Sequence, residues 1–333
     1  MEKARANLCF IPVFILIVLA SAVFLTGCAE YKAETNADDE MLKLDQKMND
    51  LAGQLILNAD DKEIKYELGK AYFDYALEKS KANNVSEGNE PILIEKDRKI
   101  GALLIHGFGA SPWEMKGLAE FLASKNITVY AARLTGHGNS IEELKKTSMD
   151  DWVNDVSSAY SALSKMTDET YIIGMSTGGA LSLYFSENAK NKPAGIVSIA
   201  SPIYVRDKRA QWAFLAQYFV SSVPVKLTGE EKEHYYSSKP SVALMEFFRL
   251  IKSYKDELGK INVPVLIVQS SNDTTVDPNS AFYIYGHLGS KDKKIAFYDA
   301  SQHVIIRSEQ KDKVFDEIYS FIKQKTTKKQ NKN

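Results

Sequence analysis

From residue 91 onward, short apolar runs alternate with longer stretches in which apolar residues recur at helical spacing. Such runs are typical of buried strands, and the periodic stretches are typical of amphipathic helices. The pattern predicts strands at Pro91–Glu95, Ile100–His106, Thr128–Arg133, Thr170–Met175, Gly195–Ala200, Val263–Gln269 and Lys294–Tyr298. It predicts helices near Pro112–Lys125, Met149–Lys165, Gly178–Ala189 and Lys311–Lys323. This alternation favours an α/β fold, with a mostly parallel central sheet flanked by helices.

Two further stretches with helical spacing precede this body. Their apolar positions are Met41, Leu44, Met48, Leu51 and Leu55, then Ile64, Leu68, Ala71, Tyr72, Tyr75 and Ala76. We predict a helical hairpin within residues 28–90, with a polar tether over Ala29–Asp39 before it and a linker over Ala82–Glu90 after it. Because one hairpin cannot bury its own apolar face, residues 41–82 are expected to pack on the main body or to bind a protein partner.

The first residues predict that the protein is exported from the cytoplasm. Lys3 and Arg5 precede an apolar run from Leu8 to Leu25, which is typical of a signal peptide. The run ends in Leu25-Thr26-Gly27-Cys28, which resembles a bacterial lipobox. The resemblance implies that residues 1–27 are removed and that Cys28 carries a lipid anchor in a bacterial membrane. The alternative is an uncleaved signal anchor, and both interpretations place the body outside the cytoplasm.

Composition excludes several other classes of protein. The formal net charge is -1, which argues against a nucleic-acid partner. The two cysteines, Cys9 and Cys28, both lie in the first thirty residues, so the folded body can form no disulfide, and no spacing indicates a zinc site. We expect no metal and no cofactor. The basic residues at the C-terminus, within 326–333, are expected to form a solvated tail.

The motif that carries chemistry is Gly174-Met175-Ser176-Thr177-Gly178, a GxSxG sequence between a predicted strand and a predicted helix. A sharp turn at this place exposes the serine hydroxyl, which becomes a nucleophile only when a base takes its proton. In this architecture the acid follows the serine and the histidine comes last. Asp273, just after a strand, and His303, in the loop after the last strand, satisfy this order. Asp277 and Asp299 are the alternative acids.

The loop after the strand at 100–106 is the fourth element of this site. It reads Leu103-Leu104-Ile105-His106-Gly107-Phe108-Gly109. Such a loop supplies one backbone N–H of an oxyanion hole, and the residue after the nucleophile supplies the other. We assign these donors to Phe108 and Thr177. The neighbouring His106 and His137 are interpreted as structural residues that brace the loops, and His234 and His287 as surface or core histidines.

Together these motifs resemble the bacterial carboxylesterase and monoacylglycerol lipase branch of the α/β-hydrolases. The resemblance rests on His106-Gly107-Phe108-Gly109-Ala110-Ser111-Pro112, Leu134-Thr135-Gly136-His137-Gly138, Asp150-Asp151-Trp152, the GMSTG turn, Asn272-Asp273 and Ser301-Gln302-His303-Val304. It implies an α/β-hydrolase domain over residues 91–325 that hydrolyses short- to medium-chain acyl esters or monoacylglycerols through an acyl-enzyme intermediate, without a cofactor. The lipobox and the helices before Pro91 depart from the small esterases of this branch.

Residues 204–260 interrupt the rhythm of strands and are rich in aromatic side chains. We expect them to form a small helical cap over Ser176 that encloses an apolar pocket for a small-molecule or lipid ester. A thioesterase or lysophospholipase acting through the same three residues is one alternative. The other is a non-catalytic binding protein anchored at the surface.

Overall fold

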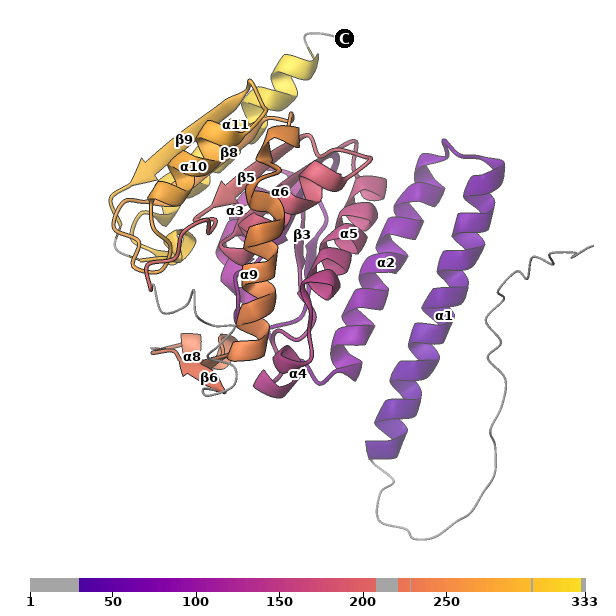
Figure 1. Cartoon of the computed structure of the whole chain (residues 1–333). Helices are drawn as coiled ribbons and strands as arrows, with labels where there is room; N and C mark the ends of the chain where they lie inside the picture. The colour runs from indigo at the N-terminus through magenta and orange to yellow at the C-terminus, as the bar shows by residue number, and fades with distance from the viewer. Residues whose placement is uncertain (1–29, 208–220, 228, 301, 331–333) are drawn as a thin grey trace, which may run out of the picture.

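The computed structural model describes residues 30–207, 221–227, 229–300 and 302–330. Its centre is a seven-stranded sheet in the order β1-β3-β2-β4-β5-β8-β9 (Figure 1). The strands are β1 (Ile92–Ile94), β2 (Asp97–Ile105), β3 (Ile127–Ala132), β4 (Glu169–Met175), β5 (Gly195–Ile199), β8 (Val265–Ser270) and β9 (Lys293–Tyr298). Only β1 pairs with its neighbour in antiparallel orientation. The predicted strands and the mostly parallel sheet are therefore confirmed.

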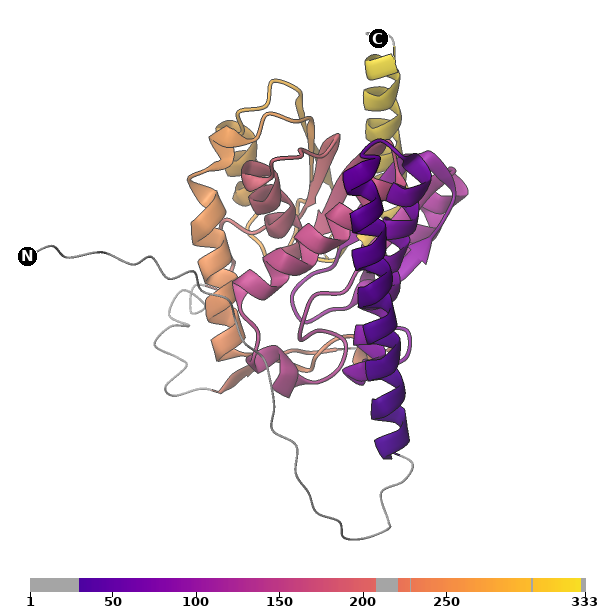
Figure 2. The ribbon, with the colours of Figure 1, turned by 90° about the vertical axis from the view of Figure 1, so that its right-hand side faces the viewer.

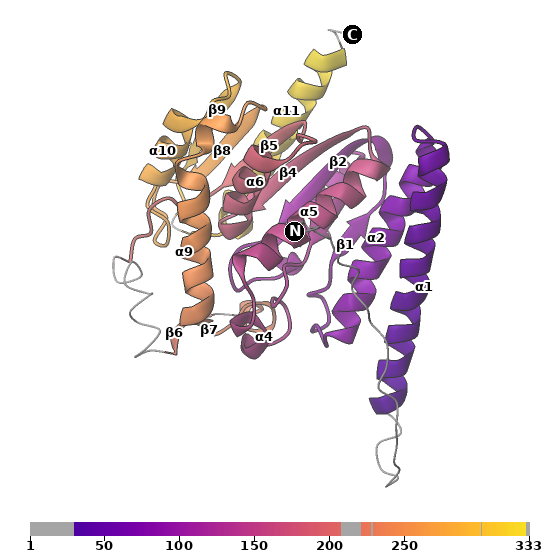
Figure 3. The same cartoon turned by 45° about the vertical axis from the view of Figure 1, so that its right-hand side comes forward.

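Helices cover both faces of the sheet, because alternate strand residues are apolar on each side. On β2, Leu103 and Ile105 join the core beneath α5 (Met149–Met166), α6 (Thr177–Asn188) and α9 (Ser241–Lys255). Ala102 and Leu104 join the core beneath α3 (Lys116–Ser124) and α11 (Lys311–Gln330). Figure 3 shows α5, α6 and α9 together in front of the sheet. Each strand thus contributes to two separate hydrophobic cores.

The N-terminal segment forms the predicted hairpin, with helices α1 (Glu30–Leu57) and α2 (Lys62–Ala82). The side chain of Asp61 caps α2 by accepting hydrogen bonds from the backbone N–H groups of Glu63 and Ile64. Helix α2 packs on α5, and α1 packs on α2 at the outside of the molecule (Figure 2). The packing is close, because a Cβ added at Gly69 would lie 2.4 Å from the carbonyl oxygen of Ala162.

The expected tether over Ala29–Asp39 is wrong from Glu30 onward, because α1 already begins there. This stretch contains no glycine or proline and is rich in the strong helix formers alanine and glutamate. None of the helices within the described residues is long and apolar enough to cross a bilayer. The apolar run Leu8–Leu25 and Cys28 lie outside those residues.

The described part of the cap contains the short helix α8 (Glu231–His234) and α9, together with a two-stranded sheet that the pattern did not predict, β6 (Ser222–Pro224) and β7 (Ser238–Pro240). The aromatic residues between 208 and 220, which we expected to belong to the cap, lie outside the described residues. Short helices that the pattern did not predict are α4 (Ile141–Lys145) and α10 (Asn279–His287).

The C-terminal segment also differs from the expected solvated tail. Helix α11 continues to Gln330, so the predicted tail begins inside a helix. Its Thr326 hydroxyl lies 3.1 Å from the Tyr171 hydroxyl and donates a hydrogen bond to Glu169 at 3.1 Å. These contacts attach the last turns of α11 to the start of β4.

Candidate active site

Ser176 lies in the sharp turn between β4 and α6. Its backbone adopts φ 52° and ψ -113°, a left-handed conformation that is strained for a residue with a side chain. The glycines of the motif allow this turn, because a Cβ at Gly178 would lie 2.1 Å from the Ile105 carbonyl oxygen and one at Gly174 would lie 2.1 Å from that of Gly178. The Ser176 N–H donates to the Ile199 carbonyl at 2.8 Å. The hydroxyl therefore stands at the N-terminus of α6, as the motif predicts.

The structure brings the three predicted side chains together. His303 Nε2 lies 3.0 Å from Ser176 Oγ, and His303 Nδ1 lies 2.7 Å from Asp273 Oδ2. The alternative acids are engaged elsewhere, because Asp277 accepts from the Asn279 N–H and Asp299 accepts from the Asn272 amide. The geometry therefore favours Asp273 over both alternatives.

Asp273 is held in its ionised form. Burial alone would raise the pKa of this carboxyl group, but its hydrogen bond and electrostatic interaction with the His303 ring, with the N–H groups of Val276 and Thr275, outweigh burial and lower its pKa. Gln269 donates a further hydrogen bond to Oδ2 at 3.1 Å. An ionised carboxylate at Nδ1 keeps the proton on that nitrogen, so Nε2 faces Ser176 as an acceptor.

The loop that follows β2 lies directly beside Ser176. A Cβ added at Gly107 would lie 3.5 Å from the Ser176 Cβ, and the first turn of α6 touches the end of β2 through Gly178. Within the part of the chain that the structure describes, the Phe108 N–H donates to no protein group. Phe108 and Thr177 therefore belong to two segments that meet beside Ser176, where the donors of an oxyanion hole are expected.

Glu114 is a site residue that the sequence did not reveal. Its side chain is 3% exposed, and its carboxylate accepts from the Gly107 N–H at 2.7 Å and from the Tyr235 hydroxyl at 2.8 Å. Burial raises its pKa, against the opposing effects of these two donors and of the charges on His303 and Arg307. An acid within an amphipathic helix is normally solvated, so the sequence pattern carries no signal for this role.

The histidines interpreted as structural brace the same loop. His106 Nδ1 lies 2.8 Å from the Gly107 carbonyl oxygen, and its Nε2 accepts from the Leu134 N–H at 3.2 Å. His137 packs edge-on against the Phe108 ring, with centroids 5.9 Å apart. Burial lowers the pKa of His137 to about 4 and that of His106 well below its ordinary value. Both rings are therefore neutral at pH 7 and act in packing and hydrogen bonding.

The segment expected as a linker, Ala82–Glu90, is attached to this site. Asn89 is buried, and its Oδ1 accepts from the Ser111 hydroxyl at 2.6 Å and lies 2.7 Å from His234 Nδ1. The His234 ring stacks on Trp113 with centroids 4.1 Å apart. The segment between the hairpin and the body therefore joins the loop that follows β2 to the cap.

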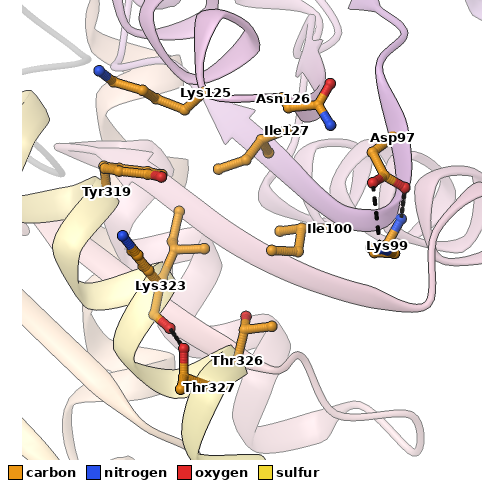
Figure 4. A pocket seen from close by; sticks show the side chains of 11 residues that line it. Asp97, Lys99, Ile100, Lys125, Asn126, Ile127, Tyr319, Lys323, Thr326 and Thr327 are labelled. Carbon is orange, nitrogen blue, oxygen red and sulfur yellow. Dashed lines mark hydrogen bonds and ion pairs between the residues drawn. The ribbon is translucent and has the colours of Figure 1, made fainter. Parts of the chain in front are cut away.

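Two cavities lie away from these residues. One, of about 190 Å³, lies between α11 and the amino-terminal ends of β2 and β3, with Asp97, Ile127 and Lys323 among its lining residues (Figure 4). The other, of about 310 Å³, lies between the hairpin and the body, where Arg133 and Asp155 line it. Neither contains Ser176, Asp273 or His303, which lie at the carboxyl edge of the sheet. Among the described residues no acidic, histidine and cysteine side chains gather as a metal site.

Comparison with known proteins agrees with this geometry. The family model described as Serine aminopeptidase, S33 (Hydrolase_4) matches residues 97–311. The chain is 33% identical over 223 residues to a thermostable monoacylglycerol lipase of Bacillus sp. strain H-257, covering 66% of this chain and 88% of the lipase. It is 28% identical over 227 residues to a carboxylesterase of Bacillus subtilis strain 168, covering 66% of this chain and 91% of that enzyme.

Solved structures show the same fold. The structure reported for the metagenome-derived lipolytic enzymes LipS and LipT superposes with a TM-score of 0.68 at 29% identity, covering 72% of this chain and 99% of that one. The hairpin α1–α2 lies outside the residues that the family model matches. The chain belongs to this α/β-hydrolase family and is a serine ester hydrolase of the monoacylglycerol lipase and carboxylesterase type.

Proposed function

We propose that this protein is a lipid-anchored carboxylesterase that hydrolyses monoacylglycerols and other short- to medium-chain acyl esters outside the cytoplasm. Ser176 is the nucleophile, His303 the general base and Asp273 the acid that orients it. The observation that carries the proposal is the continuous hydrogen-bonded line from Ser176 Oγ through His303 to Asp273, with distances of 3.0 and 2.7 Å. The names of the relatives support an ester substrate with a lipid chain.

Acylation begins when Ser176 Oγ attacks the ester carbonyl while His303 Nε2 accepts the hydroxyl proton. The negative charge that develops on the carbonyl oxygen is stabilised by the N–H groups of Phe108 and Thr177. The tetrahedral intermediate then collapses, the bond to the alcohol breaks, and His303 gives its proton to the leaving oxygen. The acyl group remains on Ser176 as an ester.

Deacylation repeats these steps with water as the nucleophile. His303 accepts a proton from the water as it attacks the acyl-enzyme, and the same two N–H groups stabilise the second oxyanion. Collapse releases the carboxylic acid and returns the proton to Ser176. Asp273 stays ionised throughout and stabilises the positive charge that His303 carries in both transition states.

The test compares the soluble form that begins at Ala29 with its Ser176→Ala variant, and uses Ser124→Ala as a matched exposed-serine control. We expect the parent protein and Ser124→Ala to hydrolyse p-nitrophenyl butyrate and to be labelled by a fluorophosphonate probe. We expect Ser176→Ala to do neither. A folded Ser176→Ala protein that keeps turnover refutes the nucleophile. A folded parent protein that neither labels nor turns over refutes the enzyme and favours a binding role.

The anchor belongs to the same proposal and has its own test. The lipobox-like sequence supports lipidation of Cys28, and α1 begins two residues later at Glu30. In bacteria grown with radiolabelled palmitate, the full chain and Cys9→Ser are expected to carry label and Cys28→Ser to lack it. Label that persists in Cys28→Ser contradicts the lipid anchor.

A protein partner for residues 41–82 is a further part of the proposal. Support comes from the outer face of α1, where Leu42 is 57% exposed. Cross-linking in intact cells through a photoreactive residue at position 42 is expected to capture one defined protein. The same probe at position 40, an exposed polar position on the other side of α1, is the control, and equal labelling from both positions contradicts the partner.

A further inference from the structure

The cap places a cation beside the loop proposed to bind the oxyanion. Lys239 is the middle residue of β7 and pairs with Val223 of β6. Side chains alternate along a strand, so Lys239 faces opposite to its two neighbours in β7. Its Nζ lies 5.9 Å from the centroid of the Phe108 ring. The ammonium group therefore approaches the loop whose Gly107 lies against Ser176.

This ammonium has no counter-ion of its own. Among the described residues, Lys239 Nζ makes no hydrogen bond and no ion pair. The side chain is partly buried, and burial lowers its pKa against the opposing charge of Glu114. Both Glu114 oxygens already accept, one from the Gly107 N–H and the other from the Tyr235 hydroxyl. The ammonium group of Lys239 contacts the face of the Phe108 ring but no charged acceptor among the described residues, and a partly buried cation without such an acceptor points to a ligand that supplies the anion.

A second cation that interacts with Glu114 comes from the loop that carries His303. Arg307 follows His303 by four residues, and its Cζ lies 3.5 Å from the centroid of the Trp113 ring. Its side chain is exposed, and its guanidinium group makes no ion pair or hydrogen bond within the described residues. Its charge lowers the pKa of Glu114, as does that of His303. One cation from the cap, against Phe108, and one from the loop after β9, against Trp113, thus both interact electrostatically with Glu114.

We propose that Lys239, assisted by Arg307, selects esters that carry a carboxylate or phosphate close to the scissile bond. This inference rests on the proposed function and narrows its substrate class. A neutral ester leaves the Lys239 ammonium without a charged acceptor. An anionic ester supplies one, which the described residues of the protein do not. Because the pairing persists into the transition state, it raises kcat/KM for the anionic ester.

The test uses three esters matched in chain length: 1-butyrylglycerol, 1-butyrylglycerol 3-phosphate and 1-succinylglycerol. The second ester carries its anion on the alcohol and the third carries it on the acyl chain. The proteins are wild type, Lys239→Met, and Lys252→Met, which removes an exposed lysine from α9 of the same cap. Turnover of neutral 1-butyrylglycerol reports the proposed esterase activity independently of the selection for charge.

For at least one anionic ester, we expect wild type to show a higher kcat/KM than for 1-butyrylglycerol. Lys239→Met is expected to lower that value by ten- to a hundredfold, or about 1.4 to 2.7 kcal/mol, and to change the neutral ester less than about threefold. Lys252→Met is expected to match wild type on all three. The ester that responds identifies which side of the scissile bond carries the anion.

Two results would overturn the inference. Equal losses on neutral and anionic esters in Lys239→Met would make this residue only a structural partner of Glu114. Unchanged kcat/KM on both anionic esters would show that Lys239 does not meet the substrate. A wild-type protein that hydrolyses none of the three esters contradicts the proposed function itself, which separates the two failures.

Discussion

Replacing Glu114 by glutamine tests whether a carboxylate outside the proposed triad holds the oxyanion loop in position. The carboxylate accepts two hydrogen bonds, from the Gly107 N–H at 2.7 Å and from the Tyr235 hydroxyl at 2.8 Å. Glutamine keeps one acceptor oxygen for the Gly107 N–H, and its NH₂ group can only donate to the Tyr235 hydroxyl oxygen. The carboxylate charge is therefore lost and the direction of the Tyr235 bond is reversed, while the side chain keeps nearly the same shape.

The size of the effect follows from this loss. A hydrogen bond to a charged group contributes about 1.5–3 kcal/mol. Complete loss of one oxyanion donor costs about 3 kcal/mol of transition-state stabilisation, which sets the upper limit for displacing Phe108. We therefore expect Glu114→Gln to lower kcat by roughly ten- to a hundredfold. Tyr235→Phe leaves the Gly107 bond intact and is expected to lower kcat less.

Steady-state hydrolysis of p-nitrophenyl butyrate separates positioning from a merely structural role. A displaced oxyanion donor acts on the transition state, so kcat should fall while KM stays within about twofold. Thermal unfolding of each variant verifies that the protein remains folded at the assay temperature. A folded Glu114→Gln protein with wild-type kcat would refute the reasoning, because the loop would then hold its place without this carboxylate.

Three further changes test other parts of the site and the fold. In Gly178→Ala the new Cβ meets the Ile105 carbonyl oxygen at 2.1 Å, so we expect about 1–3 kcal/mol lower stability in urea and a large loss of kcat; full activity would contradict the tight turn. Asp273→Asn is expected to lower kcat about 10⁴-fold, because an amide that donates to His303 Nδ1 favours the wrong tautomer; a loss below tenfold would exclude its orienting role. Burial raises the pKa of Glu187 to about 8, so its contribution to stability is complete below about pH 4.5 and is lost as pH rises through 8. Glu187→Gln should therefore flatten the pH dependence of the urea unfolding free energy by roughly 5 kcal/mol at most, and an unchanged profile would refute the raised pKa.

The position of the reacting groups could be predicted because each depends on chain order around a parallel sheet. Ser176 follows β4, Asp273 follows β8 and His303 follows β9, and the carboxyl ends of parallel strands share one edge. The GxSxG sequence also predicts the strained turn, since its glycines remove the side chains that would collide. Strand periodicity, chain order and one short motif were sufficient for these elements.

Other parts of the site depend on contacts between distant segments, which periodicity does not encode. The sequence pattern predicts that Glu114 is a solvated helix residue, yet Tyr235 of the cap donates a hydrogen bond to it and helps to bury it. Lys239 lies in a strand of three residues, too short for an alternating pattern to appear, and its place over Phe108 follows from the fold of the cap. The sequence pattern therefore located Ser176, Asp273 and His303, the residues of the proposed triad, but missed the residues that surround them.

The hairpin is part of the hydrolase body and not an independent appendage. Helix α2 buries Leu68, Ala71 and Phe73, and Phe73 belongs to the same hydrophobic core as the residues beneath α5. Beyond α2, Asn89 connects the Ser111 loop with His234 of the cap. Deletion of residues 28–82 would expose this core and disturb the segment that contains Asn89. Lost turnover after such a deletion would therefore not prove a direct role in catalysis. The proposed partner is expected on the outer face of α1, where single substitutions separate binding from folding.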